Sequence, residues 1–207
     1  MIKTAVIPQC TDKVEFEVCF TSSASQCIYC ARTKTSTPDS FSGFLLSSKF
    51  RIDRANSAGS LNSVKTVSVN GTVRYRVTAD YKYRSVEIDG GDFGLVNQIM
   101  VSNQTFTVGG PLALFSSYEK SSSGASWSGE TRNNGGTFRL YSFKLTGEDG
   151  TVKLDLVPVV KDNVTYLYDR KSGELLGKSS GSGTFGKGGV TADALSLAAS
   201  GVSDIAH

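Results

Sequence analysis

Three acidic residues near the middle of the chain have types and spacing that suit glycoside hydrolysis. Glu87 and Asp89 alternate along one expected strand, so their side chains share a face, and Asp92 follows shortly afterwards. A retaining hydrolase needs two carboxylates about 5–5.5 Å apart. Here Gly90 and Gly91 interrupt the strand where a second glutamate would stand. We therefore interpret the segment as a strand that ends in a turn, and glycoside hydrolysis is the least favoured function.

Nucleophilic and nucleotide chemistry both lack the context that they need. The only histidine is His207, the last residue, so a Ser–His or Cys–His pair has no internal base. The segment Gly181–Gly186 has the spacing of a dinucleotide-binding loop, and Lys187 follows it as in a phosphate-binding loop. Both motifs require a parallel strand before them and a helix after them, which the sequence does not predict here. We expect a turn-rich surface loop, and no catalytic residues.

Four cysteines lie within the first thirty residues, at Cys10, Cys19, Cys27 and Cys30. Cys27 and Cys30 have the spacing of zinc ligands, but the other two do not form a second such pair. The segment around Cys27 also reads as a strand, whereas a metal knuckle needs a tight turn. Cys19 continues an expected outward-facing row with Glu15 and Glu17. We favour free thiols, which fit a reducing cytoplasm, over a Cys19–Cys27 disulfide, and both over a metal site.

A polar, glycine-rich segment over residues 121–136 carries the residue types that bind sugars. Its tryptophan can stack on a sugar face, and its polar neighbours can hold hydroxyl groups. A single tryptophan also packs under its own loop or against a partner subunit, so this is a binding hypothesis only. The candidate carbohydrate-binding residues are Trp127, Glu130, Arg132, Asn133 and Asn134.

Calcium is the one cofactor that the acidic residues bring into question. A calcium site needs six to eight oxygen ligands that converge on one point. Asp89, Asp92 and Asp169 are available, but their positions in the sequence do not predict that they converge. We therefore expect no cofactor.

The composition is typical of one large all-β domain. The 207 residues include 22 glycines and only 4 prolines, which suits many short strands joined by tight turns. The net charge is +3 with both signs interspersed, so no electrostatic footprint for nucleic acid is visible. No apolar run approaches the roughly 18 residues that span a membrane, and the N-terminus lacks the apolar core of a secretory signal. We expect contact with neither nucleic acid nor membrane.

Alternation of apolar and polar residues predicts about twelve short strands. The strongest signal covers Lys13–Phe20, and we expect the turn Thr21–Ser25 to return this strand as a hairpin onto Cys27–Thr33. We expect Asn70 and Gly71 to close a second hairpin, because both residues accept the positive φ angles of a type I′ turn. With no helices alternating between the strands, this pattern indicates a two-sheet antiparallel sandwich.

The last third of the chain predicts the two longest strands, Thr137–Thr146 and Thr151–Val160. Pro158 lies inside the second of them and implies a sheet edge or a bulge there. Asp169 begins a turn, where its carboxylate can accept backbone N–H bonds. We place one domain over 1–189 and a C-terminal tail over 190–207, with a short helix or docking segment around Ala192–Ala199.

In order and spacing, these segments resemble the laminin-G-like, concanavalin A-like jelly rolls of bacterial surface proteins and phage virion proteins. The resemblance covers nearly the whole chain and implies the fold class: all-β, a two-sheet antiparallel β-sandwich of the concanavalin A-like jelly-roll type. Because this fold hosts lectins, glycosidases and scaffolds, it does not select a function. The motifs that carry the resemblance are the opening strand Lys13–Phe20, Arg139–Leu145, Leu156–Pro158, Tyr168–Asp169 and Gly173.

We expect a non-catalytic surface module, most of all a structural or decoration protein of a phage virion. Such a protein is assembled in the host cytoplasm, lies on the virion surface, and contacts capsid or tail proteins or further copies of itself. The alternative is a carbohydrate-binding adhesion domain on a bacterial cell surface, with Trp127 against a cell-surface glycan. A glycoside hydrolase is a distant third.

Overall fold

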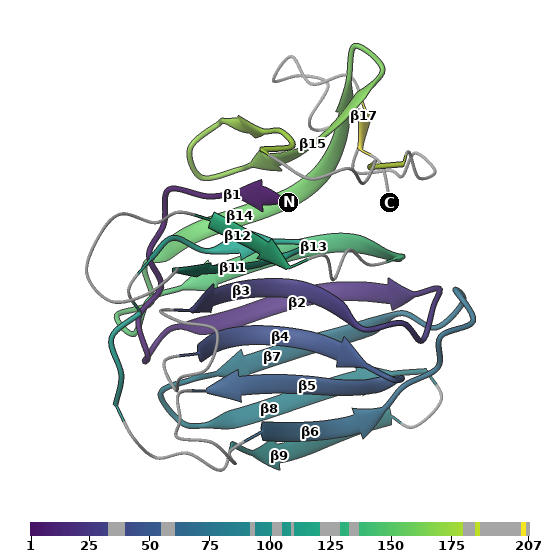
Figure 1. The fold of residues 1–207 in the computed structure, drawn as a ribbon, viewed down its shortest axis with the longest axis vertical. Helices are drawn as coiled ribbons and strands as arrows, with labels where there is room; N and C mark the ends of the chain where they lie inside the picture. Colours follow the sequence, from purple (N-terminus) through teal and green to yellow (C-terminus); the bar gives the residue numbers. More distant parts are fainter. Residues whose placement is uncertain are drawn as a thin grey trace.

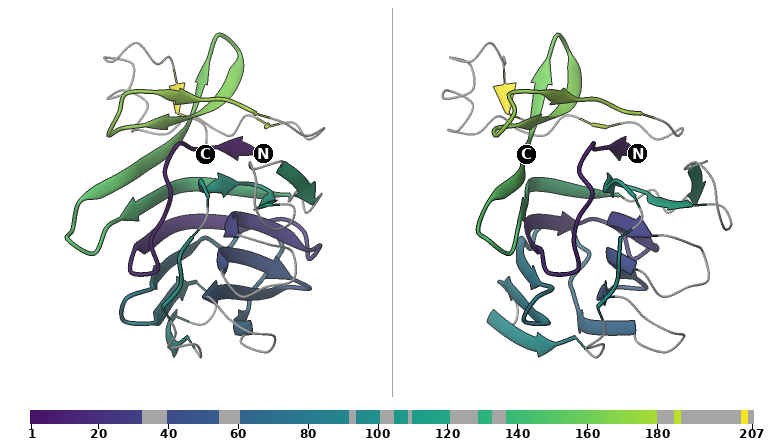
Figure 2. Two further views of the ribbon diagram at one scale, coloured as in Figure 1. Left: turned by 60° about the vertical axis from the view of Figure 1, so that its left-hand side comes forward. Right: turned by 90° about the vertical axis from the view of Figure 1, so that its left-hand side faces the viewer.

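A computed structural model shows two stacked sheets of almost wholly antiparallel strands (Figures 1 and 2). It describes residues 1–32, 40–54, 61–91, 94–100, 105–108, 110–120, 129–132, 137–179, 185–186 and 204–205. The described residues contain no helix, and so none of the length and hydrophobicity needed to cross a bilayer. The predicted all-β, two-sheet antiparallel sandwich is confirmed.

The first sheet, here called sheet A, has eight strands in the main order β1-β10-β3-β4-β5-β6, with β11 beside β3 and β12 beside β11. In Figure 1 its strands β3 to β6 lie in front of the second sheet. Its strands are β1 (Ile2–Lys3), β3 (Gln26–Arg32), β4 (Ser40–Leu46), β5 (Lys49–Arg54), β6 (Leu61–Thr66), β10 (Ala113–Leu114), β11 (Ser117–Lys120) and β12 (Gly129–Arg132).

The second sheet, here called sheet B, has nine strands in the order β16-β15-β14-β13-β2-β7-β8-β9, with β17 beside β14. The long strand β14 extends above the sandwich and carries β15 with it (Figure 1). Its strands are β2 (Lys13–Phe20), β7 (Tyr75–Asp80), β8 (Ser85–Gly90), β9 (Gly94–Ile99), β13 (Phe138–Thr146), β14 (Val152–Lys161), β15 (Val164–Asp169), β16 (Leu175–Leu176) and β17 (Asp204–Ile205).

The two predicted hairpins are wrong, although the strands on either side of them exist. β2 pairs with β13 and β7 in sheet B, whereas β3 pairs with β4 in sheet A, so Thr21–Ser25 links the two sheets. The turn at Asn70 and Gly71 likewise joins β6 of sheet A to β7 of sheet B. Gly71 has the expected positive φ, 78°, but Asn70 does not, so the turn is not of type I′. Asn70 Oδ1 instead accepts the N–H of Thr72 at 3.0 Å. A tight turn of this kind reverses the chain without deciding which sheet it enters.

The predictions for the late strands are confirmed. β13 and β14 form a hairpin around residues 147–150, and β13 pairs with β14 only as far as Leu156. Pro158 therefore lies just beyond the paired stretch, where its missing N–H breaks no bond to β13. Asp169 is buried, and its Oδ1 accepts the N–H groups of Asp155 at 3.0 Å and Lys171 at 3.1 Å. The expected helix around Ala192–Ala199 lies outside the described residues.

A layer of aromatic rings fills the space between the sheets. Phe16 of β2 and Phe143 of β13 belong to sheet B, and Tyr29 of β3 belongs to sheet A. The three ring centres lie 5.6–6.3 Å apart, at separations typical of stabilising aromatic pairs. All three side chains are buried, so this layer joins the two sheets at their middle.

A buried hydrogen bond between two tyrosines also crosses the core. The hydroxyls of Tyr29 and Tyr81 lie 3.0 Å apart, and the Tyr81 hydroxyl also donates to the carbonyl of Asp53 at 3.2 Å. Burial raises the pKa of both hydroxyls well above the usual range, so both remain protonated. The Tyr81 ring stacks on Phe41 with centres 4.0 Å apart. Tyr81 follows β7 of sheet B, so these contacts tie the end of β7 to sheet A.

We predict that Tyr81→Phe destabilises the protein by about 1–3 kcal/mol, because it leaves the buried Tyr29 hydroxyl without its partner. Tyr29→Phe should cost less, about 0.5–1.5 kcal/mol, since the Tyr81 hydroxyl keeps the Asp53 carbonyl. Urea unfolding of both variants measures the two free energies. Equal costs for the two substitutions would contradict this assignment of hydrogen bonds.

Candidate functional site

The predicted sugar-binding cluster falls mostly outside the described residues. Trp127, Asn133 and Asn134 belong to that part of the chain. Glu130 and Arg132 lie on β12, where their backbones pair with Glu119 and Ser117 of β11. Carbohydrate binding by this cluster therefore stays a prediction.

The acidic pair Glu87 and Asp89 lies on the outer face of sheet B and is exposed to solvent. Glu87 is flanked by Thr78 and Asn97 on the neighbouring strands. Asp89 is flanked in the same way by Arg76 and Leu95, and Asp92 lies outside the described residues. Among the described residues, neither carboxylate has an acid directly opposite it on a neighbouring strand.

All four cysteines are free thiols, and one of them departs from its predicted environment. Cys27 and Cys30 are buried beside Phe44. Cys19 was expected to face solvent with Glu17, but its side chain is buried. Alternation correctly placed Cys19 on the outer face of β2, since Cys19 pairs with the exposed Arg139. It did not predict that the Cys19 side chain is buried on that face. Burial raises the pKa of the Cys19 thiol.

Charged side chains of opposite sign alternate across the outer face of sheet B. Glu17 contacts Arg74 at 2.9 Å and Arg76 at 3.4 Å, and the Arg74 guanidinium lies 3.7 Å from the centre of the Tyr141 ring. A β-bulge between Leu140 and Ser142 supplies Tyr141 as an extra residue on β13. The negative charge of Glu17 is thus paired with two arginines, and one of these arginines also packs on Tyr141. Within the described residues, no group of three or more His, Cys, Asp or Glu could hold a metal ion.

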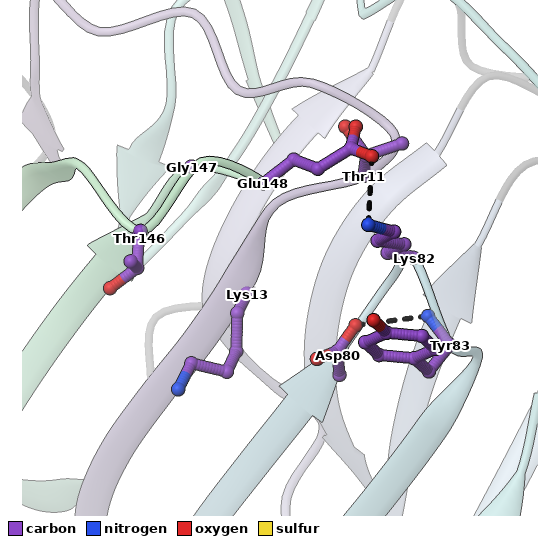
Figure 3. A pocket seen from close by; sticks show the side chains of 9 residues that line it. Thr11, Lys13, Asp80, Lys82, Tyr83, Thr146, Gly147 and Glu148 are labelled. Carbon is purple, nitrogen blue, oxygen red and sulfur yellow. Dashed lines mark hydrogen bonds and ion pairs between the residues drawn. The ribbon is translucent and has the colours of Figure 1, made fainter.

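A small pocket of about 200 Å³ lies at one end of this outer face (Figure 3). The start of β2, the end of β7 with its following turn, and the turn between β13 and β14 contribute to it. These segments are far apart in the sequence, and the register of sheet B places them side by side. The pocket is lined by Thr11, Lys13, Asp80, Lys82, Tyr83, Thr146, Gly147, Glu148 and Gly150.

Two turns hold the walls of the pocket. In the turn after β7, Asp80 Oδ1 accepts the N–H of Tyr83 at 3.0 Å, and the exposed Tyr83 ring lies beside Asp80 (Figure 3). In the turn after β13, Asp149 accepts both the N–H and the hydroxyl of Thr151 at 2.9 Å. Gly150 completes this turn with a φ of 82°, which glycine adopts without strain.

The pocket carries balanced charge. Lys82 Nζ lies 2.9 Å from Glu148 Oε1. The other two charged residues of the lining are Asp80 and Lys13, and the Nζ atom of Lys13 lies 3.2 Å from Oε2 of Glu15. The hydrogen bond from Lys82 lowers the pKa of Glu148, and the same bond raises the pKa of Lys82. The ring of Tyr83 is 70 % exposed beside these polar groups. An open aromatic ring with paired charges around it suits a neutral ligand that bears hydroxyl groups.

One polar atom in the pocket wall lacks a partner. The Oγ1 atom of Thr146 is buried and makes no hydrogen bond within the described part of the chain. A buried hydroxyl without a partner costs free energy. The pocket was not predicted from the sequence. Its only local signals were the turn residues Asp80, Asp149 and Gly150, which predict turns but not their proximity.

No family model matches the sequence, and a search of curated proteins finds no match.

We predict that Lys82→Met raises the pKa of Glu148 toward its ordinary value of 4.5, because the bond that lowers it is lost. Because the pKa of Glu148 is lower in the folded state than in the unfolded state, its ionised carboxyl stabilises the folded state at pH values above 4.5. This contribution is lost as the pH falls through the lowered pKa. The energy is small, because both side chains are exposed to solvent, which screens the interaction between them. Titration of the carboxyl carbons by NMR measures the shift.

Asp149 is the internal control for this titration, because hydrogen bonds from Thr151 lower its pKa and Lys82 does not contribute. It should stay lowered in the Lys82→Met variant. A Glu148 carboxyl that titrates identically in the two proteins would show that Lys82 is not its partner.

Proposed function

We propose that this chain is a non-catalytic surface module with a jelly roll of the laminin-G-like, concanavalin A-like type. In this proposal it serves as a structural or decoration protein of a phage virion and acts by assembling with neighbouring protein. The observation that carries the proposal is the edge of sheet B formed by strand β9, which pairs only with β8 in the part of the chain that the structure describes. The resemblance of the sequence to virion jelly rolls supports the virion setting.

The other strands that end a sheet are short or carry charge, which are two ways in which proteins prevent pairing at an edge. In the described residues, β1, β16 and β17 have two residues each. β6 carries Lys65, and β12 carries Glu130 and Arg132. β9 has neither protection, because its six residues, GLVNQI, include no charge and no proline.

The side chains of β9 make this edge apolar as well as open. On the outer face of the sheet, Leu95 is 62 % exposed and Ile99 is 74 % exposed, with Asn97 between them. Burying side chains of this size contributes about 1.5–3 kcal/mol each. A long, uncharged, apolar edge is a liability for a free monomer and an asset for a protein that assembles.

We predict that the purified protein self-associates as its concentration rises and that Leu95→Lys with Ile99→Lys makes it monomeric. The lysines place charge on the edge and remove its apolar side chains, which opposes pairing. Size-exclusion chromatography with light scattering measures the mass. Val164→Lys is the matched control, since Val164 is also apolar and 51 % exposed but lies on β15. A wild-type protein that stays monomeric at millimolar concentration would overturn the proposed assembly role.

A carbohydrate-binding module is the second candidate, and the pocket beside Tyr83 favours it. Carbohydrates are neutral or weakly charged and rich in hydroxyl groups, and they stack on exposed aromatic rings. The charge balance of the pocket and the 70 % exposed Tyr83 ring fit such a ligand.

A glycan array tests this candidate with four proteins: wild type, Tyr83→Phe, Tyr83→Ala and Trp127→Ala. We predict that neutral glycans bind the wild type and Tyr83→Phe, which keeps the ring, and that Tyr83→Ala loses them. Loss in Trp127→Ala alone would move the site to the cluster predicted from sequence. An array without any specific glycan would rule the candidate out.

A further inference from the structure

We propose that β9 pairs in antiparallel fashion with β9 of a second copy of this chain, with Asn97 on the two-fold axis. The result is one continuous sheet that runs through sheet B of both copies. This inference rests on the proposed assembly role and adds to it the partner and the register.

The hydrogen bonds between β8 and β9 decide which backbone groups face the open edge. The N–H of Met100 donates to the carbonyl of Arg84 at 2.6 Å, in line with the register that pairs Ser85 with Ile99. In an antiparallel ladder the hydrogen-bonded pairs alternate along the strands. Val96 and Gln98 therefore bond to β8. The N–H and C=O groups of the other three residues point away from it, and these residues are Leu95, Asn97 and Ile99.

The same three residues match themselves about a two-fold axis. With Asn97 opposite Asn97 of the second copy, Leu95 stands opposite Ile99 of that copy, and the reverse pair forms as well. Each of these is a hydrogen-bonded pair, so all six outward N–H groups gain an acceptor. The two apolar pairs lie on the outer face, where the cross-strand side chains are close enough to contact.

Registers shifted by one or two residues lose either hydrogen bonds or apolar contacts. A slip by one residue would place the groups that already bond to β8 against the second copy. A slip by two residues keeps the hydrogen-bonding phase but replaces both Leu95–Ile99 pairs by contacts of apolar side chains with Asn97. Among these registers, only the two-fold register gives every outward N–H group an acceptor and also forms both Leu95–Ile99 pairs.

The charges on the neighbouring strands do not oppose this arrangement. β9 itself carries no charge. In the two-fold register Asp89 of one copy aligns with Ser85 of the other, which carries no charge, and both β9 strands lie between them. The two Glu87 carboxylates stand about three strand spacings apart, roughly 14 Å, beyond the screening length of about 8–10 Å in physiological salt.

Engineered disulfides in the full chain test the register. Asn97→Cys should cross-link to the same residue of the second copy under mild oxidation, because the paired Cα atoms fall within the disulfide range of about 4.4–6.8 Å. Leu95→Cys alone should not, since two such residues would lie about 13 Å apart along the strands. Ile99→Cys alone should behave likewise. A mixture of the Leu95→Cys and Ile99→Cys proteins should cross-link.

Non-reducing gels read the result, with the wild type as the control for its own four cysteines. We expect about tenfold more covalent dimer from Asn97→Cys, and from the mixture, than from Leu95→Cys or Ile99→Cys alone, as the geometry of the bond requires. Equal cross-linking in all samples would overturn the register. If light scattering shows a dimer but Asn97→Cys and the mixture stay uncross-linked, the assembly role stands and this inference fails. A strictly monomeric wild type would overturn both.

Discussion

The packing of tyrosine rings against glycines is the contact on which the sandwich depends. A Cβ atom at Gly43 of β4 would clash with the Tyr29 ring, and one at Gly90 of β8 would clash with the Tyr75 ring. Each glycine thus leaves room for an aromatic side chain to lie directly on the strand. Tyr29 then reaches across the core to the hydroxyl of Tyr81. Each contact lies within one sheet, since Tyr29 pairs with Gly43 and Tyr75 pairs with Gly90 on the neighbouring strand. A methyl group at either glycine would displace the ring from its place in the core between the sheets.

The rigid core has a consequence at the border of sheet B. An open sandwich must end in edge strands, and among the described strands sheet B ends with β9, which carries no charge and no proline. The row of outer-face residues Lys13, Asp80, Ser85 and Ile99 runs directly from the pocket to β9. Assembly at the edge would therefore place a second copy of the chain near the exposed Tyr83. The β9 edge and the pocket beside Tyr83, which are the two surfaces proposed for contact, therefore lie close together on the outer face of sheet B.

The sequence predicted those features that depend on neighbours along the chain. Alternation in Lys13–Phe20 identified the buried residues of β2, and Asp169 was recognised because its bonds to Lys171 and Ser172 lie within one turn. The pairing of strands could not be predicted, because every strand edge offers the same N–H and C=O groups. The pocket was missed for the same reason, since sheet pairing alone brings Lys13 and Thr146 together. Cys19 is buried by contacts beyond its own strand.

Amide hydrogen exchange on β9 tests the central claim most directly, which is that a rigid sandwich presents one open edge to a second copy. In dilute protein the amides of Leu95, Asn97 and Ile99 should exchange fast, while those of Val96 and Gln98 are protected by β8. At high concentration the first three should become protected, and the other two should change little. Protection of all five amides that does not depend on concentration, or fast exchange of the first three at every concentration, would contradict the account.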